Sequence, residues 1–167
     1  MTEIPNLERR RIQGEIIKPI YDELVAEIGE SAAQALLARA VRRSVKSEAE
    51  RAAAAQSAPP EDMTNFNRNF EKTYANQGPK AGLDVDIVRS EETALEFNVT
   101  RCRFVEMYRE LGLGDIAHIL SCDRDGQFAT AFDPNIRLDR PQTIADGAPT
   151  CVFRYSYDKK ADPEEDK

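Results

Sequence analysis

The chain has 167 residues, a net charge of -7 and a sequence pI near 4.9. This acidic balance argues against non-specific nucleic-acid binding, which depends on clustered positive charge. No apolar run reaches the roughly 18 residues that would predict a membrane span. The length suits one domain, and 41% hydrophobic with 32% charged residues is typical of a soluble globular protein.

The amino-terminal residues include arginines but lack the apolar core of a signal peptide, so we expect a cytoplasmic protein. The arginines of 9–11 are flanked by Glu8 and Glu15, a mixed-sign pattern that we interpret as a solvated helix face. Three cysteines without a paired C-x-x-C spacing, in a chain without an export signal, favour free thiols over disulfides.

The first half of the chain shows helical periodicity. An apolar residue recurs every four positions, at Ile12, Ile16, Ile20, Leu24 and Ile28. Pro19 predicts a kink in this helix, and Gly29 predicts its end. Two more apolar stripes follow over 36–45 and 63–74. We therefore expect three helices within residues 7–75 that cover a sheet built from the rest of the chain.

After Gly82 the apolar period changes to two. Alternation over 85–87 and 95–99 predicts two antiparallel strands, and 136–138 and 151–157 predict two more, with helical segments between the pairs. The sequence thus predicts an α+β fold in which amino-terminal helices pack on an antiparallel sheet of about four strands. We expect a single domain over residues 1–157 and a disordered acidic tail at 158–167.

Strict alternation in the second strand places four side chains opposite Phe97 and Val99. These are Glu96, Asn98, Thr100 and Cys102. We interpret that face as either the lining of a pocket or a solvent-exposed surface.

The stretch "HILSCDRDGQF" at 118–128 concentrates reactive side chains. On a helix His118 and Cys122 share a face, which would allow a Cys–His pair. A cation such as Arg124 or Arg101 could lower the pKa of the thiol, and Asp125 could orient a base or carry a proton. The structural interpretation is a buried Cys122, a surface His118 and aspartates that cap a helix.

A third interpretation gathers Cys102, Cys122, Cys151 and His118 around a zinc ion, which prefers such ligands in tetrahedral sets. The scattered spacing of these residues makes it the weakest of the three. The metal ligands, and even the presence of a divalent metal, are therefore left open.

Residues 97–155 resemble the L-2-amino-thiazoline-4-carboxylic acid hydrolase family. The matching features are F-N-V-T-R-C at 97–102, C-D-R-D at 122–125, F-D-P at 132–134, Arg140, and G-x-x-x-C-x-F at 147–153. The stretch "IIKPIYDELVAEIGESAAQALL" is also similar. The resemblance implies an α+β enzyme, with cysteines at Cys102, Cys122 and Cys151, that opens a carboxylated cyclic amidine to a carbamoylated cysteine.

On this basis we expect hydrolysis of a non-peptide C–N bond in a small cyclic amidine or amide. The Cys122 thiolate would attack the amidine carbon while Asp125 or His118 moves protons. Arg101, or else Arg140, would hold the substrate carboxylate. Asn98 and Cys151 complete the expected substrate-binding set. A metal-bound hydroxide with cysteine ligands is an equally allowed route.

The alternative is a small-molecule, metal-sensing or redox-sensing binding domain on the same scaffold. In either case the expected partner is a small carboxylate rather than a nucleic acid or a membrane, and homo-oligomerisation is left open. The sharpest structural expectation is that Cys122, Asp125, Cys151 and Arg101 line one pocket, because the matched motifs must converge to form a site.

Overall fold

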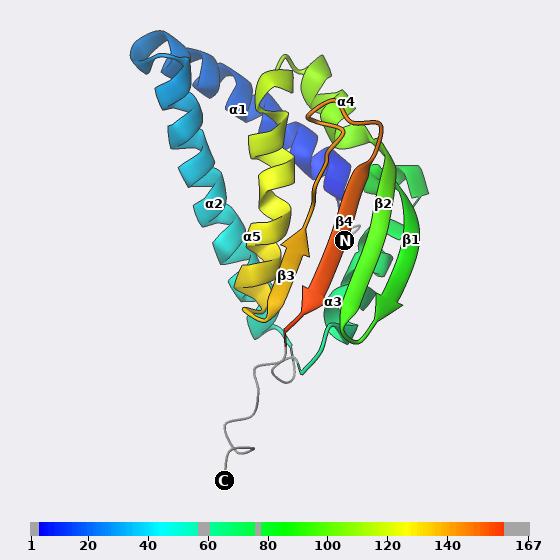
Figure 1. Ribbon diagram of the computed structural model, residues 1–167. Coiled ribbons are helices and arrows are strands. Elements are labelled where there is room, and N and C mark those ends of the chain that lie inside the picture. The colour runs from blue at the N-terminus through cyan, green and yellow to red at the C-terminus, as the bar shows by residue number, and fades with distance from the viewer. Residues whose placement is uncertain (1–3, 57–60, 76–77, 159–167) are drawn as a thin grey trace.

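The computed structural model describes residues 4–56, 61–75 and 78–158 (Figure 1). The α+β prediction is confirmed. The main helices are α1 (Asn6–Ile28), α2 (Glu30–Ala54), α3 (Thr64–Phe70), α4 (Arg103–Glu110) and α5 (Asp123–Phe132). The four strands are β1 (Leu83–Glu91), β2 (Ala94–Cys102), β3 (Ile136–Asp139) and β4 (Cys151–Tyr157). They form one antiparallel sheet in the order β1-β2-β4-β3.

Helices α1 and α2 form a hairpin that turns at Gly29. This residue has a φ of 79°, in the left-handed region that glycine adopts without steric cost. Its N–H donates to the carbonyl of Val25 at 3.0 Å, so the predicted helix end is confirmed. α1 continues across Pro19, and the kink expected there stays a prediction.

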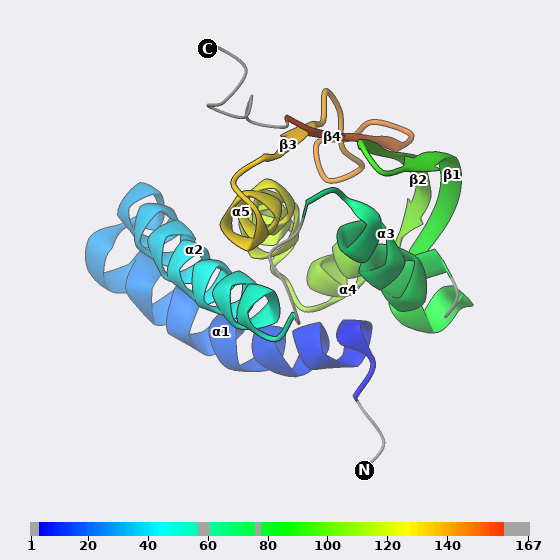
Figure 2. The same cartoon turned by 90° about the horizontal axis from the view of Figure 1, so that it is seen from below.

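The elements form three layers, which Figure 2 shows end-on. The sheet is the first layer, α3, α4 and α5 lie next to it, and α1 and α2 lie outermost. The expectation that all three amino-terminal helices cover the sheet is therefore wrong for the first two, which pack on α4 and α5. Gly14 allows this close approach, because a Cβ there would come within 2.8 Å of Leu111 Cδ1.

The apolar stripe predicted on the first helix does not face the core. Ile12, Ile16 and Ile20 are 42%, 60% and 55% exposed. The inner side of α1 is instead formed by a second set of residues: Leu7, Gly14, Ile17 and Tyr21. The period identified the helix correctly but did not identify its buried face.

The aromatic stripe predicted over 63–74 forms α3 and a π-helical turn, η1 (Glu71–Ala75). Phe70 stacks on Phe97 of β2 with ring centroids 4.2 Å apart, and Phe97 stacks on Phe153 of β4 at 4.6 Å. Such offset aromatic contacts add about 0.5–1.5 kcal/mol each beyond area burial. The aromatic column therefore joins the helices to the centre of the sheet.

Of the tail predicted at 158–167, only Asp158 lies within the described residues, where its N–H donates to the carbonyl of Asn135 at 2.9 Å. The rest of that prediction falls on residues that the structure does not describe. Within the described ranges, none of the helices combines the length and apolar character that a membrane crossing requires.

Candidate functional site

A cavity of about 500 Å³ lies between the sheet and the helices. This is within the 300–1,000 Å³ typical of small-molecule pockets. Segments from α1, α2, α3, β1, β2, β4 and α5 contribute to its lining. Its apolar walls are largely aromatic, and include Phe66, Phe70, Phe97, Phe132, Phe153 and Tyr155.

All three cysteines line this cavity as free thiols. Cys102 is the last residue of β2, Cys122 precedes α5, and Cys151 begins β4. Asp125, in the first turn of α5, lines the same space. The structure thus brings together Cys122, Asp125 and Cys151, as the sequence predicted, and adds Cys102.

An irregularity in β2 explains why Cys102 faces inward. Val85 pairs with Val99 but Asp84 pairs with Arg101, so Thr100 is an extra residue on β2. Such a β-bulge reverses the alternation beyond it. Cys102 therefore shares the inner face with Val99, and Arg101 points to the outer face. Uninterrupted alternation had assigned these two side chains to the opposite faces.

Two π-helical turns contribute to the cavity: η1, and η4 (His118–Cys122) immediately before α5. In η4 the N–H of Asp123 donates to the carbonyl of His118, the i to i+5 pattern of a π-helix. In η1 the Tyr74 hydroxyl accepts from Asn6 Nδ2 at 2.9 Å, which ties the start of α1 to the cavity wall. Turns of this kind occur frequently at functional sites.

Asp125 is the best-supported acid–base group of the site. Arg140 Nη1 donates to Asp125 Oδ2 at 2.8 Å and to the Cys122 carbonyl at 2.7 Å. Burial nevertheless raises the pKa of Asp125 to about 6, against the opposing effect of Arg140. The side chain keeps 37% of its surface accessible and lines the cavity, so the carboxyl group can reach a bound molecule.

The thiols do not have the character of ready nucleophiles. Burial, reinforced by Asp125, raises the pKa of Cys122 to about 12, although Arg140 acts in the opposite direction. Burial also raises the pKa of Cys102 to about 11. Both groups are therefore neutral thiols at pH 7, and nucleophilic attack by Cys122 requires a base within reach.

The arginines in the lining are ones that the sequence interpretation assigned to other roles. Arg10 of α1 and Arg124 of α5 line the cavity and both approach Glu48 of α2. Arg124 Nη2 donates to Glu48 Oε2 at 2.5 Å, and Arg10 Nη2 lies 3.6 Å from the same oxygen. Arg9 and Lys72 also contribute to the lining. Two arginines that share one carboxylate leave net positive charge for an anionic ligand.

Sequence inspection missed this cluster because the arginines of 9–11 have the charge pattern of a solvated helix face. One signal was available in the sequence. The first helix carries apolar residues on two of its faces, so the arginines between them are less able to form a fully solvated face. Arg124 was considered only as an activator of the thiol.

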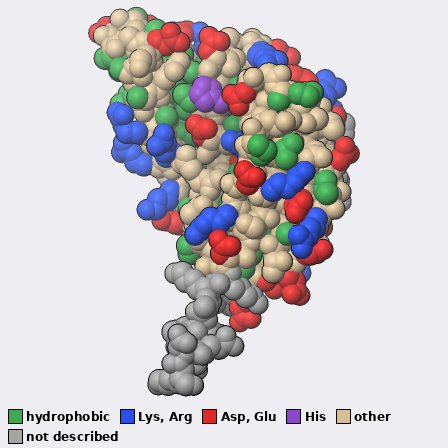
Figure 3. Space-filling model, in the orientation of Figure 1, with side chains coloured by type: hydrophobic (Ala, Val, Ile, Leu, Met, Phe, Trp, Pro, Cys, Tyr) green, Lys and Arg blue, Asp and Glu red, His purple; other side chains and the backbone are tan. Residues whose placement is uncertain are grey.

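Four other predicted site residues lie outside the cavity lining in the described structure. Arg101 is 55% exposed and pairs with Glu106, so its expected place in the pocket is wrong. Asn98 accepts from Arg154 Nη2 on the outer face of the sheet. Figure 3 shows the only histidine, His118, at the molecular surface. Arg140 lies behind Asp125.

The set of residues expected to hold a metal is incomplete in the cavity, whose lining contains the three cysteines but not His118. In the described part of the chain, no group of three or more His, Cys, Asp or Glu side chains is arranged to bind a metal ion. His118 is separated from the three thiols that would complete the set. The zinc interpretation therefore has no support in the geometry.

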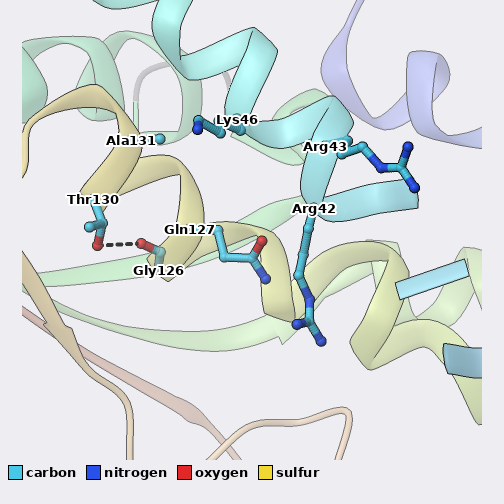
Figure 4. Close-up of a pocket in the computed structure, with 7 residues that line it drawn as sticks. All are labelled: Arg42, Arg43, Lys46, Gly126, Gln127, Thr130 and Ala131. Atoms are coloured by element: carbon cyan, nitrogen blue, oxygen red, sulfur yellow. Dashed lines mark hydrogen bonds between the residues drawn. The ribbon is translucent and has the colours of Figure 1, made fainter. Parts of the chain in front are cut away.

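A second depression lies between α2 and α5 (Figure 4). Its lining consists of Arg42, Arg43, Lys46, Gly126, Gln127, Thr130 and Ala131. Thr130 Oγ1 donates to the Gly126 carbonyl at 3.0 Å, and Arg42 and Arg43 project in different directions. The three basic side chains are solvent-exposed. With no buried acid, base or nucleophile in its lining, this depression is a poorer candidate than the cavity between the sheet and the helices.

Comparison with known proteins adds two findings. A family model described as L-2-amino-thiazoline-4-carboxylic acid hydrolase matches residues 9–155. Among solved structures, this chain is similar to the phenol-responsive sensory domain of the transcription activator PoxR with phenol. The TM-score is 0.51 at 15% identity, over 86% of this chain and 74% of that one, which shows the fold alone. The curated proteins give no match.

Proposed function

Because this chain belongs to the L-2-amino-thiazoline-4-carboxylic acid hydrolase family, we propose that its cavity binds and hydrolyses a small cyclic amidine that carries a carboxylate. One observation carries the proposal: three thiols and a carboxyl group of raised pKa share one cavity with an arginine cluster. An electrophilic ring and a carboxylate are the two groups that such a lining would recognise.

The substrate carboxylate binds at Arg10 and Arg124. Both arginine side chains are largely buried, at 12% and 13% exposure, and their shared partner Glu48 balances only one positive charge. Burial lowers the pKa of Arg124, which indicates that its charge is poorly solvated. A carboxylate placed between the two arginines restores this solvation through charge-assisted hydrogen bonds.

Asp125 is the general base and Cys122 is the nucleophile. The Asp125 carboxylate accepts the Cys122 proton while the sulfur forms a bond to the amidine carbon and the C=N electron pair moves to the ring nitrogen. The protonated Asp125 delivers this proton to the ring nitrogen. The ring C–N bond then breaks as the exocyclic amino group forms a C=N bond to the same carbon and one of its protons passes to the leaving nitrogen. Water next adds to this C=N bond and gives one proton to its nitrogen. Asp125 accepts the remaining hydroxyl proton and passes it to the Cys122 sulfur as the bond between sulfur and carbon breaks, which releases the thiol and a carbamoyl product.

The product of the reaction identifies which bond of the ring is cleaved. Cleavage of the ring C–N bond, which we expected from the sequence, releases an amine and leaves the sulfur acylated. Cleavage of the ring C–S bond releases a free thiol and leaves a urea. Amine and thiol assays on the product of 2-amino-thiazoline-4-carboxylate distinguish the two outcomes.

The proposal is tested by turnover of 2-amino-thiazoline-4-carboxylate by the wild type, Cys122→Ser and Cys102→Ser. We expect Cys122→Ser to abolish turnover with the fold intact, because a hydroxyl is a far poorer nucleophile than a thiolate. Cys102→Ser is the matched control within the same cavity and should retain activity. Mass spectrometry of the wild type during turnover should show an adduct on Cys122.

Wild-type turnover by Cys122→Ser would remove Cys122 from the mechanism. Loss of activity together with loss of a bound metal, and without an adduct, would instead support the metal-hydroxide route. Absence of turnover of any carboxylated cyclic amidine would remove the hydrolase proposal itself.

A second candidate function is small-molecule sensing without catalysis. The similarity in fold to the phenol-responsive domain of PoxR and the aromatic cavity walls support it. Calorimetric titration with phenol and with the thiazoline carboxylate separates the two functions. Tight phenol binding without turnover would favour the sensor, whereas turnover would favour the hydrolase. In both cases we propose a cytoplasmic protein whose partner is a small molecule rather than nucleic acid.

A further inference from the structure

The hydroxyl group of Tyr74 is a polar group of the cavity that the proposed mechanism does not use. Tyr74 belongs to η1 and lines the cavity together with Arg10, Arg124 and Asp125. Its ring packs against that of Phe70, with ring centroids 5.3 Å apart. Because Phe70 is itself stacked on the sheet, this packing fixes where the hydroxyl lies in the cavity wall.

One hydrogen bond determines what this hydroxyl can offer to a ligand. Asn6 Nδ2 donates to the Tyr74 oxygen at 2.9 Å. A phenolic hydroxyl can accept one hydrogen bond and donate another at the same time. Within the part of the chain that the structure describes, no acceptor takes the Tyr74 proton. Asn6 therefore orients the oxygen and leaves the O–H group to donate to a bound molecule.

The charges around Tyr74 indicate which group of the ligand receives this hydrogen bond. Burial raises the pKa of Tyr74 to about 12, Asp125 adds to this effect, and Arg10 and Arg124 oppose it. The hydroxyl therefore keeps its proton at neutral pH and lies within electrostatic reach of both arginines. The arginines attract an anionic group, whereas the ionised Asp125 carboxylate repels one. A ligand anion would lie on the arginine side of the hydroxyl, where an O–H donor strengthens its binding.

We propose that Tyr74 is a third carboxylate-binding residue, whose hydroxyl donates to the substrate carboxylate beside Arg10 and Arg124, and that Asn6 is its positioning residue. This inference rests on the proposed function, because it concerns the carboxylate that the two arginines are proposed to bind. The two oxygens of a carboxylate offer about four acceptor positions, so they can accept from two guanidinium groups and one hydroxyl together. The anion site then includes η1 as well as α1 and α5.

Calorimetric titration tests the proposal in the full chain carrying Cys122→Ser, so that binding is measured without hydrolysis. Adding Tyr74→Phe removes the hydroxyl and keeps the ring. It should raise the dissociation constant for 2-amino-thiazoline-4-carboxylate about tenfold or more. It should leave that for 2-amino-thiazoline, which lacks the carboxylate, unchanged. Tyr21→Phe is the matched control, because Tyr21 lies on α1 outside the cavity lining, and it should change neither value.

A double-mutant cycle tests the positioning role of Asn6. Asn6→Ala alone should raise the dissociation constant for the carboxylate about threefold or more, because the hydroxyl loses the donor that orients it. The same substitution should have no further effect when Tyr74→Phe is present, since the amide acts on the ligand only through the hydroxyl. A purely structural role of Asn6 would lower the affinity equally with and without Tyr74→Phe, and would overturn its assignment.

An unchanged dissociation constant in Tyr74→Phe, or an equal loss of affinity for the two compounds, would overturn the assignment of Tyr74. Turnover by the wild type separates this failure from failure of the proposed function. Turnover together with an unaffected Tyr74→Phe variant would remove Tyr74 and leave the hydrolase in place. Binding that depends on Tyr74, without turnover by the wild type, would support the carboxylate site and remove the catalysis. Absence of binding of the carboxylate would overturn both.

Discussion

Two arginine–carboxylate pairs of equal length differ in what surrounds them. Arg140 donates to Asp125 at 2.8 Å beside the cavity, and Arg101 donates to Glu106 at 2.8 Å on the surface. Hydrogen bonding by Arg101 lowers the pKa of Glu106, whereas burial raises that of Asp125 to about 6 despite Arg140. The two side chains have similar accessible surface, 37% for Asp125 and 43% for Glu106, but that of Asp125 faces the cavity. Desolvation in the cavity, rather than the ion-pair partner, therefore decides which carboxyl group can exchange protons near neutral pH.

The largest difference between the two pairs should appear on removal of the carboxylate. We expect Asp125→Asn to lower kcat by about 10²- to 10⁴-fold, the usual contribution of a general base. Glu106→Gln makes the same chemical change on the surface and should leave kcat unchanged. Steady-state kinetics with the thiazoline carboxylate measures both. Equal effects of the two variants would contradict the assignment of Asp125.

The substitution Asp125→Asn, which should lower kcat, should increase the stability of the fold near neutral pH. Because the pKa of Asp125 is raised in the folded protein, its contribution to stability is full below the ordinary carboxyl value and is lost as pH rises through about 6. Asparagine has no such titration. The melting temperature of Asp125→Asn, relative to that of the wild type, should therefore increase between pH 4 and pH 7. Such an increase would show that the ionised carboxylate is kept for function at a cost in stability.

The same contrast applies to the two candidate anchors for the substrate carboxylate. Arg124 lines the cavity and is 13% exposed, whereas Arg101 points away from it. We expect Arg124→Gln to raise KM about tenfold or more, because a charge-assisted hydrogen bond to the substrate is lost. Arg101→Gln should leave KM unchanged. An increase confined to Arg101→Gln would restore the anchor that the sequence suggested.

The sequence was sufficient for the elements and insufficient for the faces they bury. Period-two alternation predicted the four strands, because the alternation of apolar and polar residues within a segment is enough to indicate a strand. The bulge at Thr100 depends on pairing with β1, so Arg101 and Cys102 were assigned to the wrong faces. The prediction that His118 and Cys122 share a face assumed α-helical spacing. These residues instead form a π-helical turn before α5, to which that spacing does not apply.

Convergence was predictable only where motifs matched a family. Cys122, Asp125 and Cys151 were expected together for that reason, and they do line one cavity. Arg10 and Arg124 meet at Glu48 through the packing of α1, α2 and α5. A contact between three segments cannot be derived from the periodicity of any one of them, so the proposed anion site became visible only in the coordinates.

A smaller effect should appear in the pH dependence of catalysis. If Asp125 must be ionised, kcat/KM should rise with pH through about 6 rather than near 4. Arg140 lowers the pKa of Asp125, so Arg140→Gln should move this limb to higher pH. Arg101→Gln should not move it. A pH profile that stays in place without Arg140 would show that Arg140 does not tune the carboxyl group.

The smallest effect belongs to the surface pair itself. Glu106 and Arg101 are both well exposed, at 43% and 55%, so water and salt screen their attraction. The lowered pKa of Glu106 means that its contribution to stability exists above the ordinary carboxyl value and is lost as pH falls through the folded value. Glu106→Gln should therefore lower the melting temperature only slightly at pH 7. Thermal unfolding in 1 M salt, or at a pH below the folded pKa of Glu106, should remove even that difference. A decrease that persists there would show that Glu106 stabilises the fold by packing rather than by charge.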